Sequence, residues 1–282
     1  MKMTYQTQKR LYTLGRVFIL AFFAILVAAP IYWMIISSLK TRAEIVNAQV
    51  VTYWPKVFTW ENYEALFRQL NYGTFLQNSV IVSVGTAVIV TILSILGGYS
   101  LARYKFIGKG SMMMFLLITQ MIPGILVMIP TYLLFTRMRI TNTHLSLLIF
   151  YVVVNVPFCT ITMRSFFERI PASLEEASWV DGCTKLSGIV HIVLPVMFPG
   201  IVAVFVFAFI GAWNELIAGT IFLNTPDKWT IPIGLKSLIG KYDVRWGALM
   251  AGGVLALLPT ALMFVFVQRF VVEGLTAGSV KE

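Results

Sequence analysis

Charged side chains are scarce in this sequence. They make up 12% of the 282 residues, whereas 58% of the residues are hydrophobic. Soluble domains carry about 25% charged residues, and a chain with half of that cannot cover a water-facing surface. We therefore expect an integral membrane protein. The net charge is +10, but no cluster of four or more basic residues occurs. Basic loops that contact membrane lipid explain this charge, and no nucleic-acid partner is expected.

Cysteine and histidine are also rare, with two of each. Cys159 lies in an apolar run and Cys183 in a polar loop, so neither a disulfide framework nor a metal site is indicated. His144 and His191 lie near the ends of apolar segments, without the Gly-x-Ser-x-Gly or His-Glu-x-x-His pattern of a hydrolase. We expect satisfied boundary histidines and no catalytic residue.

A phosphate-binding loop is missing as well. The nearest segment, 108–111, has neither the glycine spacing nor the residue order of Gly-x-x-x-x-Gly-Lys-[Ser/Thr]. The chain is therefore not expected to bind a nucleotide or other cofactor by that route. A carrier driven by an ion gradient is one class of membrane protein that works without a nucleotide. Such carriers place ionisable residues in the membrane, and here only Glu215 falls at bilayer depth.

Long stretches without Asp, Glu, Lys or Arg predict the membrane spans. Each can hold the ~20 apolar residues that cross a bilayer. The first is longer than the core of a signal peptide, so we expect a retained helix. No polar stretch is long enough to fold alone, which predicts a single all-α transmembrane domain over 1–282. The six spans are expected near 17–39, 77–102, 111–135, 144–166, 197–223 and 247–268.

Six spans place both termini on one side of the membrane. With the N-terminus inside, twelve of the 22 Lys and Arg residues lie inside and ten outside. This small excess favours an orientation with both termini in the cytoplasm. In the expected outer loop 40–76, Tyr63, Leu66, Phe67 and Leu70 share one face of a short helix. That helix could dock a partner or pack against the bundle.

The loop between the fourth and fifth spans contains helix signals. Ser173 and Glu176 have the spacing of a capping box, and acids are favoured in a first turn. Gly182 lies where a glycine ends a helix. These signals predict a polar helix of about two turns outside the bilayer within loop 171–195, and Pro195 and Pro199 precede the next span.

The same loop resembles the signature of the permeases of ABC importers. That signature is Glu-Ala-Ala, three residues, Gly, nine residues, then Ile-x-Leu-Pro. It matches Glu176, Ala177, Gly182 and the segment 192–195, with Ser178 in place of the second Ala. Other parts of the chain look like the shorter, six-span permease of maltose-type sugar importers. These parts are segments 55–67, 213–215, 230–235, 268–269 and 274–281.

The resemblance implies an ABC type I importer permease fold with a cytoplasmic coupling helix that docks on an ATPase. It implies the coupling contacts Glu176, Ala177, Ser178, Asp181 and Gly182, and a C-terminal contact through Lys281 and Glu282. The implied partners are a longer homologous permease, two ATPase subunits that bind ATP and Mg²⁺, and an extracytoplasmic solute-binding protein. The cargo would be a carbohydrate, moved inward by alternating access across a bacterial or archaeal plasma (inner) membrane.

Polar residues within the apolar segments are candidates for the translocation path. Each could hydrogen-bond a sugar, or could equally bond a neighbouring helix at about 1 kcal/mol. For Glu215 the second alternative is a structural role, such as capping a helix beside Asn214. The candidates are Asn78, Gln120, Tyr151, Asn155, Asn214 and Glu215.

Overall fold

The computed structural model describes residues 5–47 and 49–276, with side chains described for 12–47 and 49–268. The described residues are helical apart from loops and one isolated bridge between Ile239 and Val244. In chain order the helical segments are α1 (Tyr5–Ser38), α2 (Arg42–Val46), α3 (Glu61–Gln69), α4 (Tyr72–Arg103), α5 (Lys109–Met121), α6 (Gly124–Arg137), α7 (His144–Arg169), α8 (Ala172–Val180), α9 (Lys185–Gly188), the π-helix η1 (Ile189–Val193), α10 (Leu194–Val196), α11 (Phe198–Trp213), α12 (Ile217–Phe222), the 3₁₀-helix η2 (Pro226–Lys228), α13 (Ile231–Lys236) and α14 (Trp246–Thr276).

Within the described residues, four helices are long and apolar enough to cross a membrane, and there are up to six candidate spans if each of two bent helix pairs counts as one span. The expected all-α fold with six candidate spans is thus confirmed. The chain divides into two compact units. One comprises Met1–Leu70 and Ser237–Leu257, and the other comprises Asn71–Lys236 and Leu258–Glu282.

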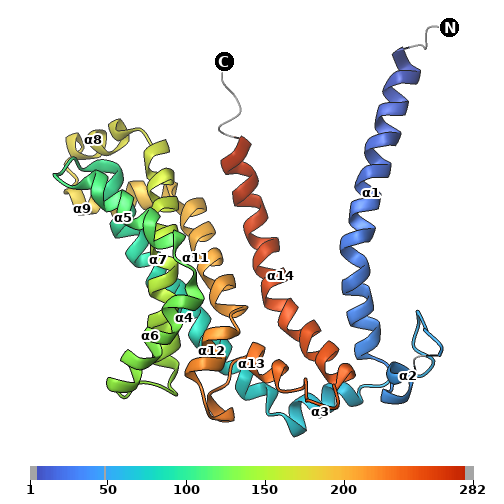
Figure 1. Ribbon diagram of the computed structural model, residues 1–282. Helices are drawn as coiled ribbons and strands as arrows, with labels where there is room; N and C mark the ends of the chain where they lie inside the picture. Colours follow the sequence, from blue (N-terminus) through green and yellow to red (C-terminus); the bar gives the residue numbers. More distant parts are fainter. Residues whose placement is uncertain (1–4, 48, 277–282) are drawn as a thin grey trace. The chain divides into compact units, whose positions relative to one another are not determined.

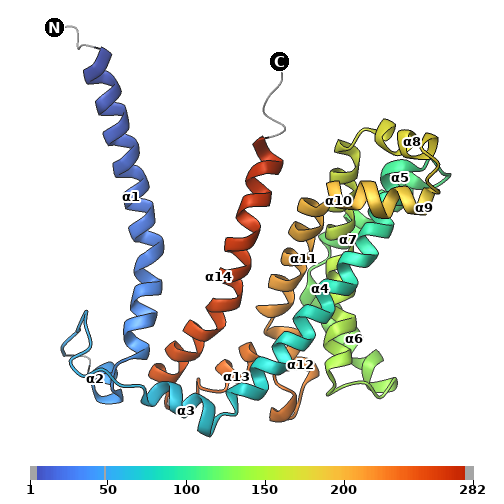
Figure 2. The same cartoon turned by 180° about the vertical axis from the view of Figure 1, so that it is seen from behind.

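The larger unit is built around α4, α7 and α11, which pack against one another (Figures 1 and 2). The buried face of α4 consists largely of Ser, Thr, Ala and Gly, and small residues let membrane helices approach closely. At Gly98 the approach is close, since a Cβ there would lie 2.9 Å from Met163 Cβ and from the Arg164 backbone nitrogen. A glycine is therefore required where α4 crosses α7.

The expected third span, 111–135, is not one straight helix. It consists of α5 and α6, which are bent by 96° at a break over Ile122 and Pro123. Proline cannot donate a backbone hydrogen bond, and it disfavours helical geometry in the residue before it. Ile122 is accordingly extended at the end of α5, and Pro123 is the N-cap of α6.

The expected fifth span, 197–223, is also interrupted. Its helix α11 ends at Trp213, and after a break over residues 214–216 the short α12 follows. At its start, α11 is bent by 75° relative to the segment Lys185–Val196. The chain therefore turns sharply at the start of α11, and its helix is broken at the end.

The smaller unit contains α1, α2, α3 and the first turns of α14. The amphipathic helix expected over 59–70 is confirmed as α3, in which Leu66 is fully buried. Phe67 is 49% exposed, so only part of the predicted apolar face is covered within the chain.

Glu44 of α2 holds the following loop against the helix through hydrogen bonds. Its carboxylate accepts hydrogen bonds from the Thr52 hydroxyl, at 2.5 Å, and from the Lys56 backbone N–H, at 3.2 Å. Burial raises the pKa of Glu44, but these hydrogen bonds and the charges of Lys40 and Lys56 outweigh it and leave the pKa below its ordinary value. Lys40 also donates to the Thr52 carbonyl and lies over the Trp33 ring.

Candidate functional site

The helix expected in loop 171–195 is α8, and its nine residues make about two and a half turns (Figure 1). The predicted capping box is wrong, because the N-cap is Pro171 and no side chain caps the helix there. The fixed φ of proline lets the helix begin immediately at Ala172. Ser173 therefore lies inside the first turn rather than at its cap.

The end of α8 is as predicted. Gly182 has φ of +88°, which glycine adopts without steric cost. Its N–H donates to the Trp179 carbonyl at 3.1 Å, and the Cys183 N–H donates to the Ser178 carbonyl at 3.0 Å. This pair of bonds is a Schellman motif, which satisfies carbonyls that the helix leaves unpaired and turns the chain sharply.

The faces of α8 differ in exposure. Glu176, Ala177 and Asp181 are exposed, together with Gly182. Ser178 is 2% exposed, and its hydroxyl donates to the Glu175 carbonyl at 2.6 Å. Ser178 thus faces the interior of its own chain, and we remove it from the expected coupling contacts.

The underside of α8 packs closely on the following segment. A Cβ at Gly188, the last residue of α9, would lie only 2.6 Å from Ser178 Oγ. Beyond it, η1 and α10 continue the same helical run into the bend before α11. Small residues on both sides therefore allow α8 to lie against the segment that leads into α11.

A buried ion pair, which the sequence analysis did not identify, holds α8 to α4. The Glu175 carboxylate accepts from Arg103 Nε at 2.6 Å and from the Tyr99 hydroxyl at 2.9 Å. The two charged side chains are 5% and 14% exposed. The sequence signals this pair only through the two adjacent acids, Glu175 and Glu176. Consecutive residues of a helix point about 100° apart, so the two carboxylates cannot both face the same side of α8.

The candidates for the translocation path have different surroundings. Asn78 is buried, and its amide donates to the carbonyls of Asp227 and Trp229, both at 2.9 Å. Asn155 is half-buried and donates to the Tyr151 carbonyl at 2.8 Å. Asn78 therefore ties α4 to the loop around η2, whereas Gln120 and Asn214 are exposed.

Glu215 lies in the break between α11 and α12. Its carboxylate accepts from the backbone N–H groups of residues 217, 218 and 219, at 2.9 to 3.2 Å. The hydroxyl of Tyr151, which is buried, donates to it at 2.9 Å. These bonds match the structural alternative, in which Glu215 caps a helix, because the first N–H groups of a helix lack partners within it.

The two histidines occupy boundary positions. His144 Nε2 lies 3.0 Å from the Lys228 carbonyl, and His191 Nδ1 lies 3.0 Å from the Ser187 carbonyl. Both rings thus have backbone partners, as the sequence analysis expected. The expected C-terminal contact residues, Lys281 and Glu282, lie outside the described residues.

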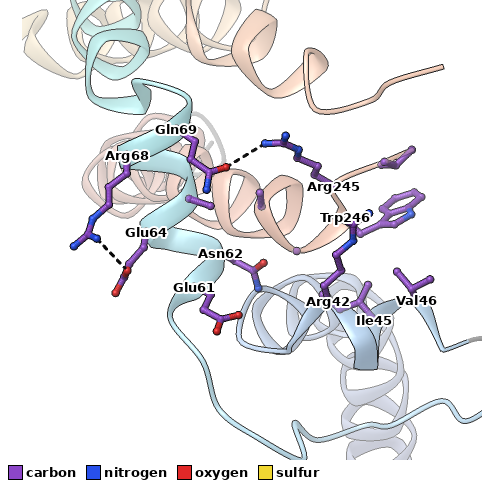
Figure 3. Close-up of a pocket in the computed structure, with 14 residues that line it drawn as sticks. Arg42, Ile45, Val46, Glu61, Asn62, Glu64, Arg68, Gln69, Arg245 and Trp246 are labelled. Carbon is purple, nitrogen blue, oxygen red and sulfur yellow. Dashed lines mark hydrogen bonds and ion pairs between the residues drawn. The ribbon is translucent and has the colours of Figure 1, made fainter. Parts of the chain in front are cut away.

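The smaller unit has a pocket of about 530 Å³ between α3 and the start of α14 (Figure 3). Arg245 reaches across it to Gln69 at 3.3 Å, and Arg68 lies 3.9 Å from Glu64. Arg42, at the rim, pairs with Asp243 at 2.8 Å. The pocket is therefore lined by charged side chains of both signs, with the exposed ring of Trp246 beside it.

Comparison with known proteins assigns the chain to a family. The sequence-family model for the inner membrane component of binding-protein-dependent transport systems matches residues 91–276. The chain belongs to this family. It is thus a non-catalytic inner membrane permease of an ABC importer, and the alternative of an ion-gradient carrier is excluded.

Three curated relatives illustrate this membership. The inner membrane ABC transporter permease protein YcjP of Escherichia coli is 34% identical over 93% of this chain and 94% of that protein. The diacetylchitobiose uptake system permease protein DasC of Streptomyces coelicolor is 32% identical, over 89% of this chain and 91% of its own. The arabinooligosaccharides transport system permease protein AraQ of Halalkalibacterium halodurans is 30% identical, over 93% of this chain and 94% of its own.

A solved structure shows the same fold. A chain of a bacterial ABC transporter involved in the import of the acidic polysaccharide alginate superposes with a TM-score of 0.81 and 21% identity. The match covers 95% of this permease and 99% of that chain. The ABC importer permease fold implied by the loop signature is thereby confirmed.

Proposed function

We propose that this permease imports an oligosaccharide or a related sugar. The observation that carries the proposal is the sugar specificity stated for relatives that align over almost the whole chain. Their names specify diacetylchitobiose, arabinooligosaccharides and sulfoquinovosyl glycerol. These compounds share hydroxyl-rich sugar rings and differ in size and charge, so the shared chemistry defines the class of cargo and not the individual sugar.

The proposed importer contains a second, longer permease, two ATPase subunits that bind ATP and Mg²⁺, and an extracytoplasmic solute-binding protein. Both termini and α8 would face the cytoplasm. Glu176, Ala177, Asp181 and Gly182 form the proposed contact with the ATPase. Ala and Gly permit close approach, and the two carboxylates can pair with basic groups, while Lys281 and Glu282 are the proposed second contact.

In this scheme, closure of the ATPase pair moves α8 as a rigid body. The Schellman turn and the close packing of Ser178 on Gly188 fix α8 against the segment leading into α11. The motion therefore reaches α11 directly, and it reaches α7 through Pro171, which follows the end of α7.

Reconstitution of the importer in proteoliposomes tests the proposal. Uptake of a radiolabelled sugar should require the binding protein outside and ATP on the side of the ATPase. Calorimetry on the binding protein, with the sugars named for the relatives as probes, should first identify the cargo. ATP-independent uptake, or ATP hydrolysis by the permease purified alone, would contradict the proposal.

The pocket between α3 and α14 is the proposed contact for the binding protein, in support of the docking alternative for segment 59–70. It combines arginines with an exposed tryptophan, residue types that are enriched where protein partners bind. An Arg245→Ala exchange should raise the concentration of binding protein that half-saturates uptake by about tenfold, as removal of one good contact does. Lys105→Ala, in the loop between α4 and α5, is the control and should leave that concentration unchanged.

A further inference from the structure

The pair Arg103–Glu175 joins two helices that are distant in the sequence. Arg103 is the last residue of α4, and Glu175 lies in the first turn of α8. The Arg103 Nε donates to Glu175 Oε1 at 2.6 Å, while its Nη2 donates to the Ile170 carbonyl at 2.9 Å. Ile170 is the C-cap of α7, so one guanidinium connects the ends of three helices.

The second oxygen of Glu175 is held from the same helix. The Tyr99 hydroxyl donates to Oε2 at 2.9 Å, one turn before Arg103 on α4. The Tyr99 ring is in turn packed edge-on against Phe167 of α7, with ring centroids 5.4 Å apart. Both carboxylate oxygens are therefore fixed by α4, and the side chains that fix them are themselves restrained by α7.

Burial makes this joint stiff. Ion pairs on a surface exchange partners with water and contribute little, whereas a buried charge needs its partner. Arg103 and Glu175 are 14% and 5% exposed, whereas the pair Arg164–Glu168 on α7 is 26% and 44% exposed. A displacement of α8 alone would leave both buried charges unpaired. Arginine also suits the position because its planar fork can donate in two directions at once.

We propose that Arg103, Glu175 and Tyr99 are positioning residues that make α4 follow α8 when the ATPase closes. This inference rests on the proposed docking of α8. It adds α4, which packs along both α7 and α11, to the elements that receive the motion. Without the joint, α8 could still bind the ATPase and hydrolysis would continue, but less of the motion would reach the helices that open the path.

The decisive variant is the double exchange Arg103→Ala with Glu175→Ala in the complete reconstituted importer. Each single exchange leaves one buried charge unpaired and should lower the thermal stability and the yield. The double exchange removes both charges, so stability should recover. If the pair has a purely structural role, uptake should recover together with the stability. The positioning role predicts that the sugar transported per ATP hydrolysed stays about tenfold lower, a typical magnitude for lost coupling.

Two further variants complete the test. Arg103→Lys keeps the charge, but a lysine cannot reach Glu175 and the Ile170 carbonyl together. The ratio of sugar transported to ATP hydrolysed should therefore fall by about threefold, less than in the double variant, because part of the coupling is kept. Arg164→Ala with Glu168→Ala removes the more exposed pair on α7 and should leave the ratio unchanged. A wild-type ratio in the double variant, or in Arg103→Lys if the double variant is not recovered, would overturn the inference. Absence of ATP-driven uptake by the wild-type importer would instead overturn the proposed function.

Discussion

Glu175 and Glu176 are neighbours in the sequence, yet they lie on different faces of α8. Glu175 is buried against Arg103, and Glu176 is exposed. The family signature includes Glu176 and not Glu175. No neighbouring residue indicates which of the two acids is buried. Their roles depend on Arg103, which is 72 positions away from Glu175. Sequence reasoning could therefore propose Glu176 as a contact residue, but it could not identify Glu175 as the residue that anchors the helix.

Gly182 gives a prediction about the Schellman turn. Gly182→Ala should strongly reduce uptake, because a side chain at positive φ costs about 1–2 kcal/mol and opens the turn after α8. Gly182→Asn should reduce it less, since asparagine tolerates this conformation. Gly110→Ala is the matched control, because Gly110 is helical and has open space around it.

Uptake and co-purification of the ATPase measure the effect of the Gly182 variants. We expect both the uptake and the amount of co-purified ATPase to decrease from the wild type to Gly182→Asn and further to Gly182→Ala. If Gly182→Ala assembles and transports like the wild type, the turn has no part in coupling.

Glu215 gives a prediction about the break after α11. Glu215→Ala should lower the thermal stability in detergent by about 2–4 kcal/mol, because a charged acceptor with four donors is lost. Glu215→Gln keeps an acceptor for the backbone and should retain most of the uptake. Asn214→Ala, at the exposed neighbour, should not change the stability.

The contrary result for Glu215 is a stable, well-assembled Glu215→Gln permease that no longer transports. That outcome would assign the carboxylate to the sugar path rather than to the helix cap.

At the scale of elements, charge-free stretches predicted where helices occur but not where they bend. Pro30, Pro130, Pro157 and Pro259 all lie inside helices that continue, whereas the chain breaks at Pro123. Neighbouring helices and side chains can satisfy the backbone groups that a proline frees in a membrane helix. Whether a proline bends a span therefore depends on packing, which the local sequence does not record.

The contact between α8 and α9 gives a prediction for a pair of exchanges. Gly188→Ala should destabilise the loop by about 1–2 kcal/mol, because the new methyl group displaces Ser178 Oγ from its hydrogen bond. Adding Ser178→Ala should recover most of this loss, since only the hydroxyl is closer than 3 Å. Thermal melts of the two single variants and the double variant give the interaction energy.

Additive losses in the Gly188–Ser178 cycle would contradict the packing of α8 on α9. Gly110→Ala again serves as the control for adding a methyl group to a helix.

The loop after α2 gives a prediction about pH. The folded chain holds the pKa of Glu44 below the ordinary value of 4.5. Its contribution to stability is therefore complete above that value and is lost as the pH falls through the lower, folded-state pKa. Cleavage of the loop by an acid-active protease should increase over this range in the wild type.

Glu44→Gln provides the reference for the pH experiment. It should be cleaved readily at every pH tested, with no transition below pH 4.5. A wild-type loop with the same flat profile would show that the Glu44 hydrogen bonds do not close the loop.

At the scale of the whole molecule, the loop signature and the outer-loop resemblances predicted the family and the fold, and both are confirmed. They could do so because the signature consists of several fixed residues at fixed spacings within a single loop. The sugar path could not be predicted in the same way. The side chains of Asn78 and Tyr151 form hydrogen bonds within the protein. Polar residues in a membrane can form hydrogen bonds to a helix as well as to a sugar, so residue type alone does not distinguish the two roles.

The central claim is that α8 is the surface on which an ATPase docks. A photo-activatable amino acid at Glu176, an exposed residue of α8, tests it in membranes that contain the complete importer. The same amino acid at Trp54, which is 63% exposed in the loop after α2, is the control, because the proposed topology places this loop outside the cytoplasm. We predict that position 176 captures a subunit identified by mass spectrometry as the ATPase, and that position 54 does not. Equal capture from both positions, or capture from position 54 alone, would contradict the account.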